Sequence, residues 1–373
     1  MTERLYYNDS FLREFDAQVL ACEPEGARWR VRLDRTAFYP TSGGQPFDTG
    51  RLGDATVVEV LDAENDDIRH FTNQPVPAGA IHCVIDWPRR FDHMQQHTAQ
   101  HMLSAAFIEL FKYQTVSFHL GREISTIDLA APSVAPRQLE EAERRVNEII
   151  FDDRPIAVRY GTAEELAAQG IRKKVEREGT LRVIDVNNFD RQPCGGTHLT
   201  RTGQAGMLVI RKCERQKQNW RVEFVAGWRA LAAARGDFAA LRQSAEHLGC
   251  GIAELPENVR RIQEERRTSQ RDAKKLAERL AELEAADLFT RNPEVSQDGK
   301  RRVIVFVSDD ATPSYLAMLA AKIVATPNVQ AVLASRAAKA LVLAQSAGLD
   351  GDMGALLREI FAPLGGKGGG SKL

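Results

Sequence analysis

Residues 97–101 read His-Thr-Ala-Gln-His, and residues 194–198 read Cys-Gly-Gly-Thr-His. The first stretch lies within a helical hydrophobic pattern over about residues 92–111, so its two imidazoles share one helix face, one turn apart. The second sets a thiol and an imidazole on either side of two glycines, which allow a tight loop. Two histidines from a helix, with a cysteine and a histidine from a loop, form a donor set that suits tetrahedral Zn²⁺. The predicted zinc ligands are His97, His101, Cys194 and His198.

Either pair alone is weak evidence for a metal, because such spacings also arise on ordinary helix surfaces and in structural loops. A zinc peptidase would carry glutamate directly after the first histidine as general base, whereas Thr98 stands there, so a peptidase is disfavoured. Four protein ligands are typical of a closed structural site, whereas a catalytic zinc keeps a position open for water. The sequence leaves both uses of the metal open.

Outward from these stretches, the pattern predicts an α+β protein. Residues 1–88 carry short alternating apolar runs separated by turn residues, which predict a small N-terminal β-barrel. Residues 89–232 mix helices and strands, which predicts an α+β zinc-containing domain. Residues 233–290 are expected to form a long helical, coiled-coil-like segment, and residues 291–373 a small C-terminal α/β domain that ends in a glycine-rich tail.

The helix expected over residues 255–290 carries an apolar seam at alternating three- and four-residue steps. Two interpretations remain open: a single surface helix that packs on its own domain, and a homodimer contact through this helix and the C-terminal domain. Exposed leucines need cover, which keeps the second interpretation in place.

Composition limits the setting of the protein. The 373 residues carry a net charge of −1, so any attraction for nucleic acid must come from local patches. No apolar run reaches the roughly 18–20 residues that cross a bilayer, and the first residues lack a signal-peptide core. Five irregularly spaced cysteines favour a reducing, cytoplasmic setting. The terminal Ser371-Lys372-Leu373 matches a peroxisomal address, which is a weak signal at three residues.

Three further motifs flank the ligand pairs. Residues 36–46 read Thr-Ala-Phe-Tyr-Pro-Thr-Ser-Gly-Gly-Gln-Pro, residues 221–227 read Arg-Val-Glu-Phe-Val-Ala-Gly, and residues 365–370 read Gly-Gly-Lys-Gly-Gly-Gly. In this order the motifs resemble the editing and C-terminal domains of alanyl-tRNA synthetase and its freestanding relatives of the long AlaX type. The resemblance covers nearly the whole chain. It implies an aminoacyl-tRNA deacylase that acts on the acceptor end of mischarged tRNA(Ala), chiefly Ser-tRNA(Ala), with Gly-tRNA(Ala) as a second candidate.

The same resemblance assigns residues to the site. It implies that the four predicted ligands hold Zn²⁺ and that residues 43–45 border the pocket. Ser117 is the better candidate to meet a substrate hydroxyl, although a half-buried strand with polar residues on one face explains the same pattern. The catalytic candidates are Ser117, His119 and Gln45. The substrate-binding candidates are Gly43, Gly44 and Thr197.

A basic run offers a tRNA contact. Residues 211–221 hold five basic residues against one acidic residue beside Trp220, a composition that suits phosphate contact and base stacking or simply a solvated hairpin. The tRNA-binding candidates are Arg211, Lys212, Lys217 and Lys367. In the family the glycine tail commonly continues further than it does here, where the sequence ends at Leu373, and this departure weakens the expectation of an RNA contact by the tail. No class II aminoacylation region is recognisable, so the chain is expected to correct errors without charging tRNA.

Editing has a clear physical purpose. A pocket shaped for alanine cannot strongly reject glycine or serine, whereas a second site that hydrogen-bonds the serine hydroxyl can refuse alanine. Neither ligand motif carries an obvious carboxylate base, so oriented water and backbone amides near Gly43 and Gly195 are the expected means of ester cleavage. Two alternatives remain: a threonyl-type editing domain acting on Ser-tRNA(Thr), and a non-catalytic zinc-stabilised module for RNA binding or dimerisation.

Overall fold

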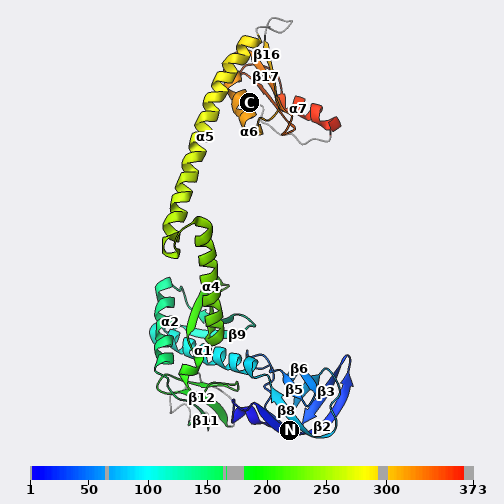
Figure 1. The fold of residues 1–373 in the computed structure, drawn as a ribbon, viewed down its shortest axis with the longest axis vertical. Helices are drawn as coiled ribbons and strands as arrows, with labels where there is room; N and C mark the ends of the chain where they lie inside the picture. Colours follow the sequence, from blue (N-terminus) through cyan, green and yellow to red (C-terminus); the bar gives the residue numbers. More distant parts are fainter. Residues whose placement is uncertain (1, 64–66, 163–164, 166–179, 293–300, 365–373) are drawn as a thin grey trace. The chain divides into compact units, whose positions relative to one another are not determined.

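A computed structural model describes the chain except residues 1, 64–66, 163–164, 166–179, 293–300 and 365–373. Lys367, the glycine tail and the terminal Ser-Lys-Leu therefore lie outside the described residues. The chain divides into two compact units, Met1–Leu241 and Arg242–Leu373. Figure 1 shows the elements of each unit along the chain.

The first unit begins with a closed barrel of six antiparallel strands, in the order β2-β3-β7-β6-β5-β8. Polar and apolar residues alternate along these strands, so one face fills the barrel and the other meets solvent. Outside the barrel, β1 and β4 form a short parallel pair. The 3-10 helix η1 follows β1 and precedes the first barrel strand. The bounds are β1 Glu3–Arg4, η1 Leu5–Tyr7, β2 Glu14–Glu25, β3 Arg28–Leu33, β4 Arg35–Thr36, β5 Gly50–Leu52, β6 Ala55–Asp62, β7 Ile68–Thr72 and β8 Gly79–Ile85.

Helix α1, Trp87–Phe111, is the central element of this unit. The side chain of Asp86 caps its first turn, Pro88 lies in that turn, and Lys112 ends the helix in a left-handed conformation with φ 62°. Every residue from 93 to 107 is buried, which is why the helix carries little amphipathic pattern. A fully buried ion pair between Arg90 of the helix and Asp48 of the barrel joins the two.

Two sheets and a second helix surround α1. A four-stranded antiparallel sheet runs in the order β14-β15-β10-β9, and a three-stranded antiparallel sheet in the order β11-β12-β13. Apolar side chains from α1, α2 and the larger sheet form one core cluster. The bounds are β9 Gln114–Leu120, β10 Ser125–Ala130, α2 Pro136–Phe151, β11 Ile156–Gly161, β12 Leu181–Val186, β13 Asp190–Pro193, η3 Thr202–Ala205, β14 Leu208–Gln216 and β15 Asn219–Ala226.

Helix α4, Gly227–Leu248, follows β15 and continues past the boundary between the two units. In the second unit, the end of helix α5 packs with helix α6 on a three-stranded sheet in which β16 and β17 are parallel and β18 is antiparallel. The remaining bounds are η4 Ile252–Glu254, α5 Leu255–Arg291, β16 Arg302–Ser308, α6 Pro313–Val324, β17 Val329–Ser335, β18 Ala340–Gln345, α7 Met353–Phe361 and η5 Ala362–Leu364.

These elements confirm the expected α+β class, the N-terminal barrel and the helical segment. The expected domain boundaries stay predictions, and α4 crosses the one drawn between residues 232 and 233. Leu276, Leu280 and Leu283 are 55–71% exposed on α5, and the homodimer contact predicted for this helix also stays a prediction. Among the described residues, no helix is both long and apolar enough to span a bilayer.

Candidate metal and substrate site

The four predicted metal ligands meet in one group. Their ligand atoms all lie within 4.8 Å of one another, although the residues come from α1 and from the loop that follows β13. The Cys194 sulfur is 3.5 Å from Nε2 of His97 and 3.2 Å from Nε2 of His198. Metal bonds of about 2.0–2.3 Å place the ligand atoms of a tetrahedral zinc site roughly 3.3–3.7 Å apart. The group can therefore hold a metal ion without rearrangement of the fold.

Each of the three imidazoles contacts a polar side chain through Nδ1, which leaves Nε2 for the metal. Such outer contacts fix the ring orientation and the tautomer of a metal-binding histidine. The pairs are His97 with Oε1 of Gln45 at 2.9 Å, His101 with Oδ2 of Asp190 at 3.3 Å, and His198 with Oγ1 of Thr98 at 3.2 Å.

Gln45 joins the barrel loop to both halves of the metal group. Its amide donates to Oγ1 of Thr197 at 2.8 Å, and its carbonyl oxygen accepts from the Thr197 backbone at 3.1 Å as well as contacting His97. The loop itself is a two-residue turn in which Gly43 and Gly44 have φ values of 53° and 84°, conformations that favour glycine. Both Gln45 and Thr197 are fully buried behind the ligands.

The loop that carries Cys194 is held from two sides. Arg182 of β12 donates to the carbonyl oxygens of Cys194 at 2.6 Å and of Gly196 at 3.0 Å. The backbone of Gly196 lies against the ring of His97, since a Cβ at this position would be 2.3 Å from Cε1 of that ring. A side chain at residue 196 would therefore displace the ring of His97, one of the predicted metal ligands.

The surroundings favour the metal-binding form of the thiol. Burial disfavours the thiolate of Cys194, but the imidazoles of His97, His198 and His101 hold the pKa of that thiol well below its usual range. Burial also lowers the pKa of His101, yet its contacts with Asp190 and Cys194 outweigh this and raise the pKa to about 9. Burial holds the pKa of His198 well below its usual range.

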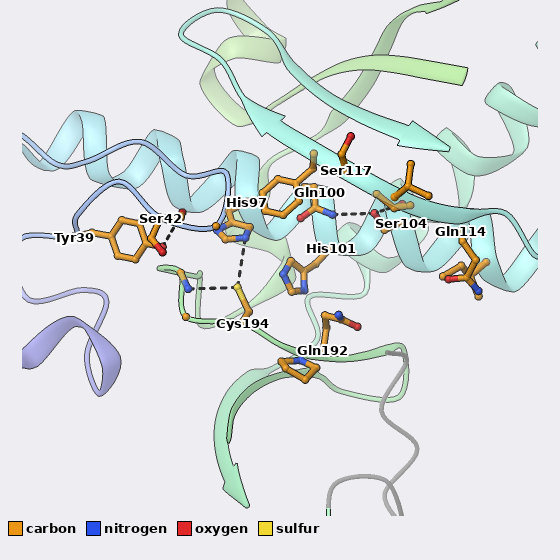
Figure 2. Close-up of a pocket in the computed structure, with 18 residues that line it drawn as sticks. Tyr39, Ser42, His97, Gln100, His101, Ser104, Gln114, Ser117, Gln192 and Cys194 are labelled. Carbon is orange, nitrogen blue, oxygen red and sulfur yellow. Dashed lines mark hydrogen bonds between the residues drawn. The ribbon is translucent and has the colours of Figure 1, made fainter. Parts of the chain in front are cut away.

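A cavity of about 480 Å³ opens beside the metal group (Figure 2). His97, His101 and Cys194 form part of its wall. The other lining comes from the barrel loop, from the far part of α1, from β9 and from β13. These residues are Tyr39, Ser42, Gly43, Gln100, Ser104, Ile108, residues 114–118, Gln192, Pro193, Gly195 and Gly196.

Some of the residues predicted for the site line this cavity and others do not. Ser117 and Gly43 line the cavity, whereas Gly44, Gln45, His119 and Thr197 are not among its lining residues. The Ser117 hydroxyl donates to Asp128 at 2.5 Å.

The sequence analysis did not identify three polar side chains that are hydrogen-bonded to one another on the cavity wall. Gln100 donates to Oγ of Ser104 at 2.9 Å, and Thr115 donates to the same oxygen at 2.8 Å. Gln100 lies three residues after His97 and one before His101, so the helical spacing that identified the ligands could also have placed it beside them. Asp190 carried no comparable signal, because its contact with His101 depends on the path of β13.

The basic candidates lie on the β14–β15 hairpin. Arg211 pairs with Asp237, and Lys212 pairs with Glu214 at 2.6 Å. Lys217 occupies the turn of the hairpin with a φ of 56°. Their role in tRNA binding stays a prediction, as does that of Lys367.

The amino-acid sequence is similar to one family profile and to several known proteins. Residues 181–223 match the family profile described as the threonyl and alanyl tRNA synthetase second additional domain. The alanyl-tRNA editing protein AlaX-L of Pyrococcus horikoshii is 32% identical over 385 residues, which cover 100% of this chain and 93% of that protein. The alanyl-tRNA editing protein Aarsd1 of Mus musculus is 32% identical over 297 residues, 74% of this chain and 71% of its own length. The alanine–tRNA ligase of Pyrococcus furiosus is 30% identical over 312 residues, 79% of this chain but 34% of the ligase. The chain therefore belongs to the family of alanyl-tRNA editing proteins.

Proposed function

We propose that this chain is a zinc-dependent hydrolase that cleaves the ester bond of mischarged tRNA(Ala), chiefly Ser-tRNA(Ala), with Gly-tRNA(Ala) as a second substrate. Membership of the alanyl-tRNA editing family supports hydrolysis of an aminoacyl ester on tRNA(Ala). One observation carries the proposal: the cavity has three of the predicted metal ligands in its wall and several hydroxyl and amide side chains among the rest of its lining.

The donor set supports Zn²⁺ as the metal. One thiolate and three imidazoles are ligands that zinc prefers, and the distances of 3.5 Å and 3.2 Å from the Cys194 sulfur to Nε2 of His97 and of His198 suit a tetrahedral ion. His97, His101, Cys194 and His198 would hold it. Held by all four residues, zinc would have no open position and would shape the pocket; with one ligand released, it would supply a Lewis acid that polarises a carbonyl or lowers the pKa of a bound water.

The chain's own residues orient the ester. Ser117 and Gly43 lie in the wall where the aminoacyl group would sit, and the backbone amides of Gly43 and Gly195 are candidates to stabilise the developing oxyanion. Gln45 and Thr197 act as positioning residues, since their contacts fix the first ligand histidine. The ester is activated enough that orientation and modest electrostatic help suffice for cleavage.

Contact with the rest of the tRNA acceptor end is assigned to the basic residues of the β14–β15 hairpin and of the tail. Lys217 at the hairpin turn suits a phosphate contact. Arg211 and Lys212 would exchange carboxylate partners for phosphate. Lys367 completes the set.

The test is hydrolysis of Ser-tRNA(Ala), Gly-tRNA(Ala), Ala-tRNA(Ala) and Ser-tRNA(Thr) by metal-loaded protein. The expected result is rapid loss of the seryl ester on tRNA(Ala), with the alanyl ester spared. Cys194→Ala should abolish it, and Cys213→Ala, which removes a half-buried cysteine of β14 outside the metal group, should not. Preference for Ser-tRNA(Thr) would indicate threonyl-type editing. Absence of hydrolysis of every ester would leave a non-catalytic RNA-binding or assembly module.

A further inference from the structure

The amide of Gln100 is held in one orientation on the cavity wall. The residue is 4% exposed on α1, and its nitrogen donates to Oγ of Ser104 at 2.9 Å. Thr115 of β9 donates to the same oxygen at 2.8 Å. Because Ser104 is fully buried between these two donors, the nitrogen of Gln100 is committed and its carbonyl oxygen is directed elsewhere.

That carbonyl oxygen, Oε1, is buried and has no hydrogen-bond partner among the described residues. Gln100 is nevertheless part of the cavity lining. In Figure 2 the amide lies between His97 and Ser104, with its oxygen on the side of the metal ligands. A buried acceptor without a partner is costly, so a position that keeps one beside a metal group is suited to a donor brought by a ligand.

A seryl ester offers two donors, the α-ammonium group and the side-chain hydroxyl. None of the described residues that line the cavity is aspartate or glutamate, so the wall carries no side-chain carboxylate to balance an ammonium charge. A neutral amide oxygen matches a neutral hydroxyl. Alanine has no hydroxyl and would leave this oxygen unpaired, which is the kind of difference that lets an editing site refuse the correct amino acid.

Resting on the proposed deacylation, we propose that Gln100 is a specificity-determining residue whose carbonyl oxygen accepts a hydrogen bond from the side-chain hydroxyl of the substrate's seryl group. Ser104 and Thr115 are positioning residues that keep this oxygen turned toward the substrate. Ser117 is less suited to this acceptor role, because it is exposed and its hydroxyl is engaged with Asp128 at 2.5 Å.

The test compares Ser-tRNA(Ala) with 2-aminobutyryl-tRNA(Ala), in which a methyl group replaces the hydroxyl at nearly constant size. The wild type should prefer the seryl ester in kcat/KM by roughly ten- to hundredfold. Gln100→Leu should lower kcat/KM for the seryl ester by a similar factor and bring the ratio of the two esters close to one. Metal content equal to that of the wild type shows that the neighbouring ligands are intact.

Two further variants keep the test sharp. Ser104→Ala frees the amide of Gln100 to rotate. It should therefore reduce the preference in kcat/KM for the seryl over the 2-aminobutyryl ester, but by less than Gln100→Leu does. Gln96→Leu is the matched control, because this buried amide of α1 contacts the backbone of Ala226 and does not line the cavity. In Gln96→Leu the ratio of kcat/KM for the seryl ester to kcat/KM for the 2-aminobutyryl ester should equal that of the wild type, even if the protein is less stable.

The outcomes separate the two proposals. Equal losses on both esters in Gln100→Leu, with normal metal content, would overturn the role of Gln100 while leaving the deacylation intact. A seryl preference that survives in both Gln100→Leu and Ser104→Ala would overturn it as well. Failure of the wild type to hydrolyse either ester would refute the deacylation and, with it, the role of Gln100.

Discussion

Replacement of one glycine in the Cys-Gly-Gly-Thr-His loop should weaken zinc binding by about 100-fold, and replacement of its neighbour should not. The Cβ of Gly196→Ala would lie 2.3 Å from Cε1 and 2.5 Å from Nδ1 of His97, and 3.0 Å from Oε1 of Gln45. The Cβ of Gly195→Ala would meet its nearest neighbour, the hydroxyl of Tyr7, at 3.7 Å, which is an ordinary contact. Neither glycine is among the described residues with positive φ, so alanine strains neither backbone.

The magnitude follows from the size of the clash. Carbon atoms pack at about 3.5–4.0 Å, so the ring of His97 must move by more than about 1 Å to accept Gly196→Ala. Metal sites tolerate changes of only about 0.2 Å in ligand distance. Loss of outer contacts alone typically weakens metal binding by about 10–100-fold, and displacement of a ligand should reach at least the upper end of that range. The expected loss is therefore on the order of 100-fold, or about 2.7 kcal/mol of binding free energy.

The measurement is zinc affinity by competition with a chromophoric chelator, for the wild type, Gly195→Ala and Gly196→Ala. Urea unfolding of the metal-free proteins serves as the control for folding, since overpacking itself costs about 1–3 kcal/mol. Zinc affinity within threefold of the wild type in Gly196→Ala would refute the proposed close approach. Equal weakening in both variants would show that the loop, rather than the ring contact, is responsible.

Three further predictions concern the surroundings of the site. Gln45→Leu should weaken zinc binding by about 10–100-fold in the same competition assay, whereas Gln96→Leu, which also loses buried amide bonds, should not. Arg90→Met leaves Asp48 buried without its partner and should lower the free energy of unfolding by about 3–5 kcal/mol in urea; a loss below about 1 kcal/mol would contradict this. Burial lowers the pKa of His70 from 6.5 to about 4. As the pH falls from 6.5 toward 4, this imidazole becomes protonated in the unfolded chain but stays neutral in the folded chain, so the folded state loses stability. Between pH 7.5 and pH 5, the free energy of unfolding of the metal-free wild type should therefore fall by about 2 kcal/mol more than that of His70→Gln. Parallel pH profiles of the two proteins would contradict this prediction.

Sequence patterns predicted the classes of element better than their limits. The alternating apolar runs of residues 1–88 indicated a barrel, but they do not mark where a strand begins: β2 starts at Glu14, ahead of the apolar run at residues 19–22. Its first half alternates Phe15 and Ala17 with charged or polar residues, and such a pattern is weak in a short window. Helix α4 likewise starts at Gly227, because the end of β15 and the helix meet at a glycine that a periodicity count does not mark as a boundary.

The four residues that meet in the candidate metal group could be predicted because their chemistry is visible in residue type and spacing. Their supports could not, since these contacts depend on tertiary approach: Gln45 lies 52 residues from His97, and Asp190 meets His101 only through the path of β13. The two loop glycines show the same limit. The sequence suggested a tight turn, whereas the structure requires the absence of a side chain at Gly196 alone, for the ring of His97.

The placement of Gln45 explains why a barrel accompanies the metal group. Its amide satisfies three partners at once, the ring of His97 and the backbone and hydroxyl of Thr197, and so joins the helix ligand to the loop ligand. The barrel holds this turn through Asp48, which accepts from the backbone of Tyr39 at 2.6 Å and pairs with Arg90 at the start of α1. Two buried contacts therefore join the barrel side to helix α1: Asp48 pairs with Arg90 in its first turn, and Gln45 contacts His97. A barrel fixed in this way sets the orientation of His97, because a ligand ring can keep its metal only while its outer partner stays in place.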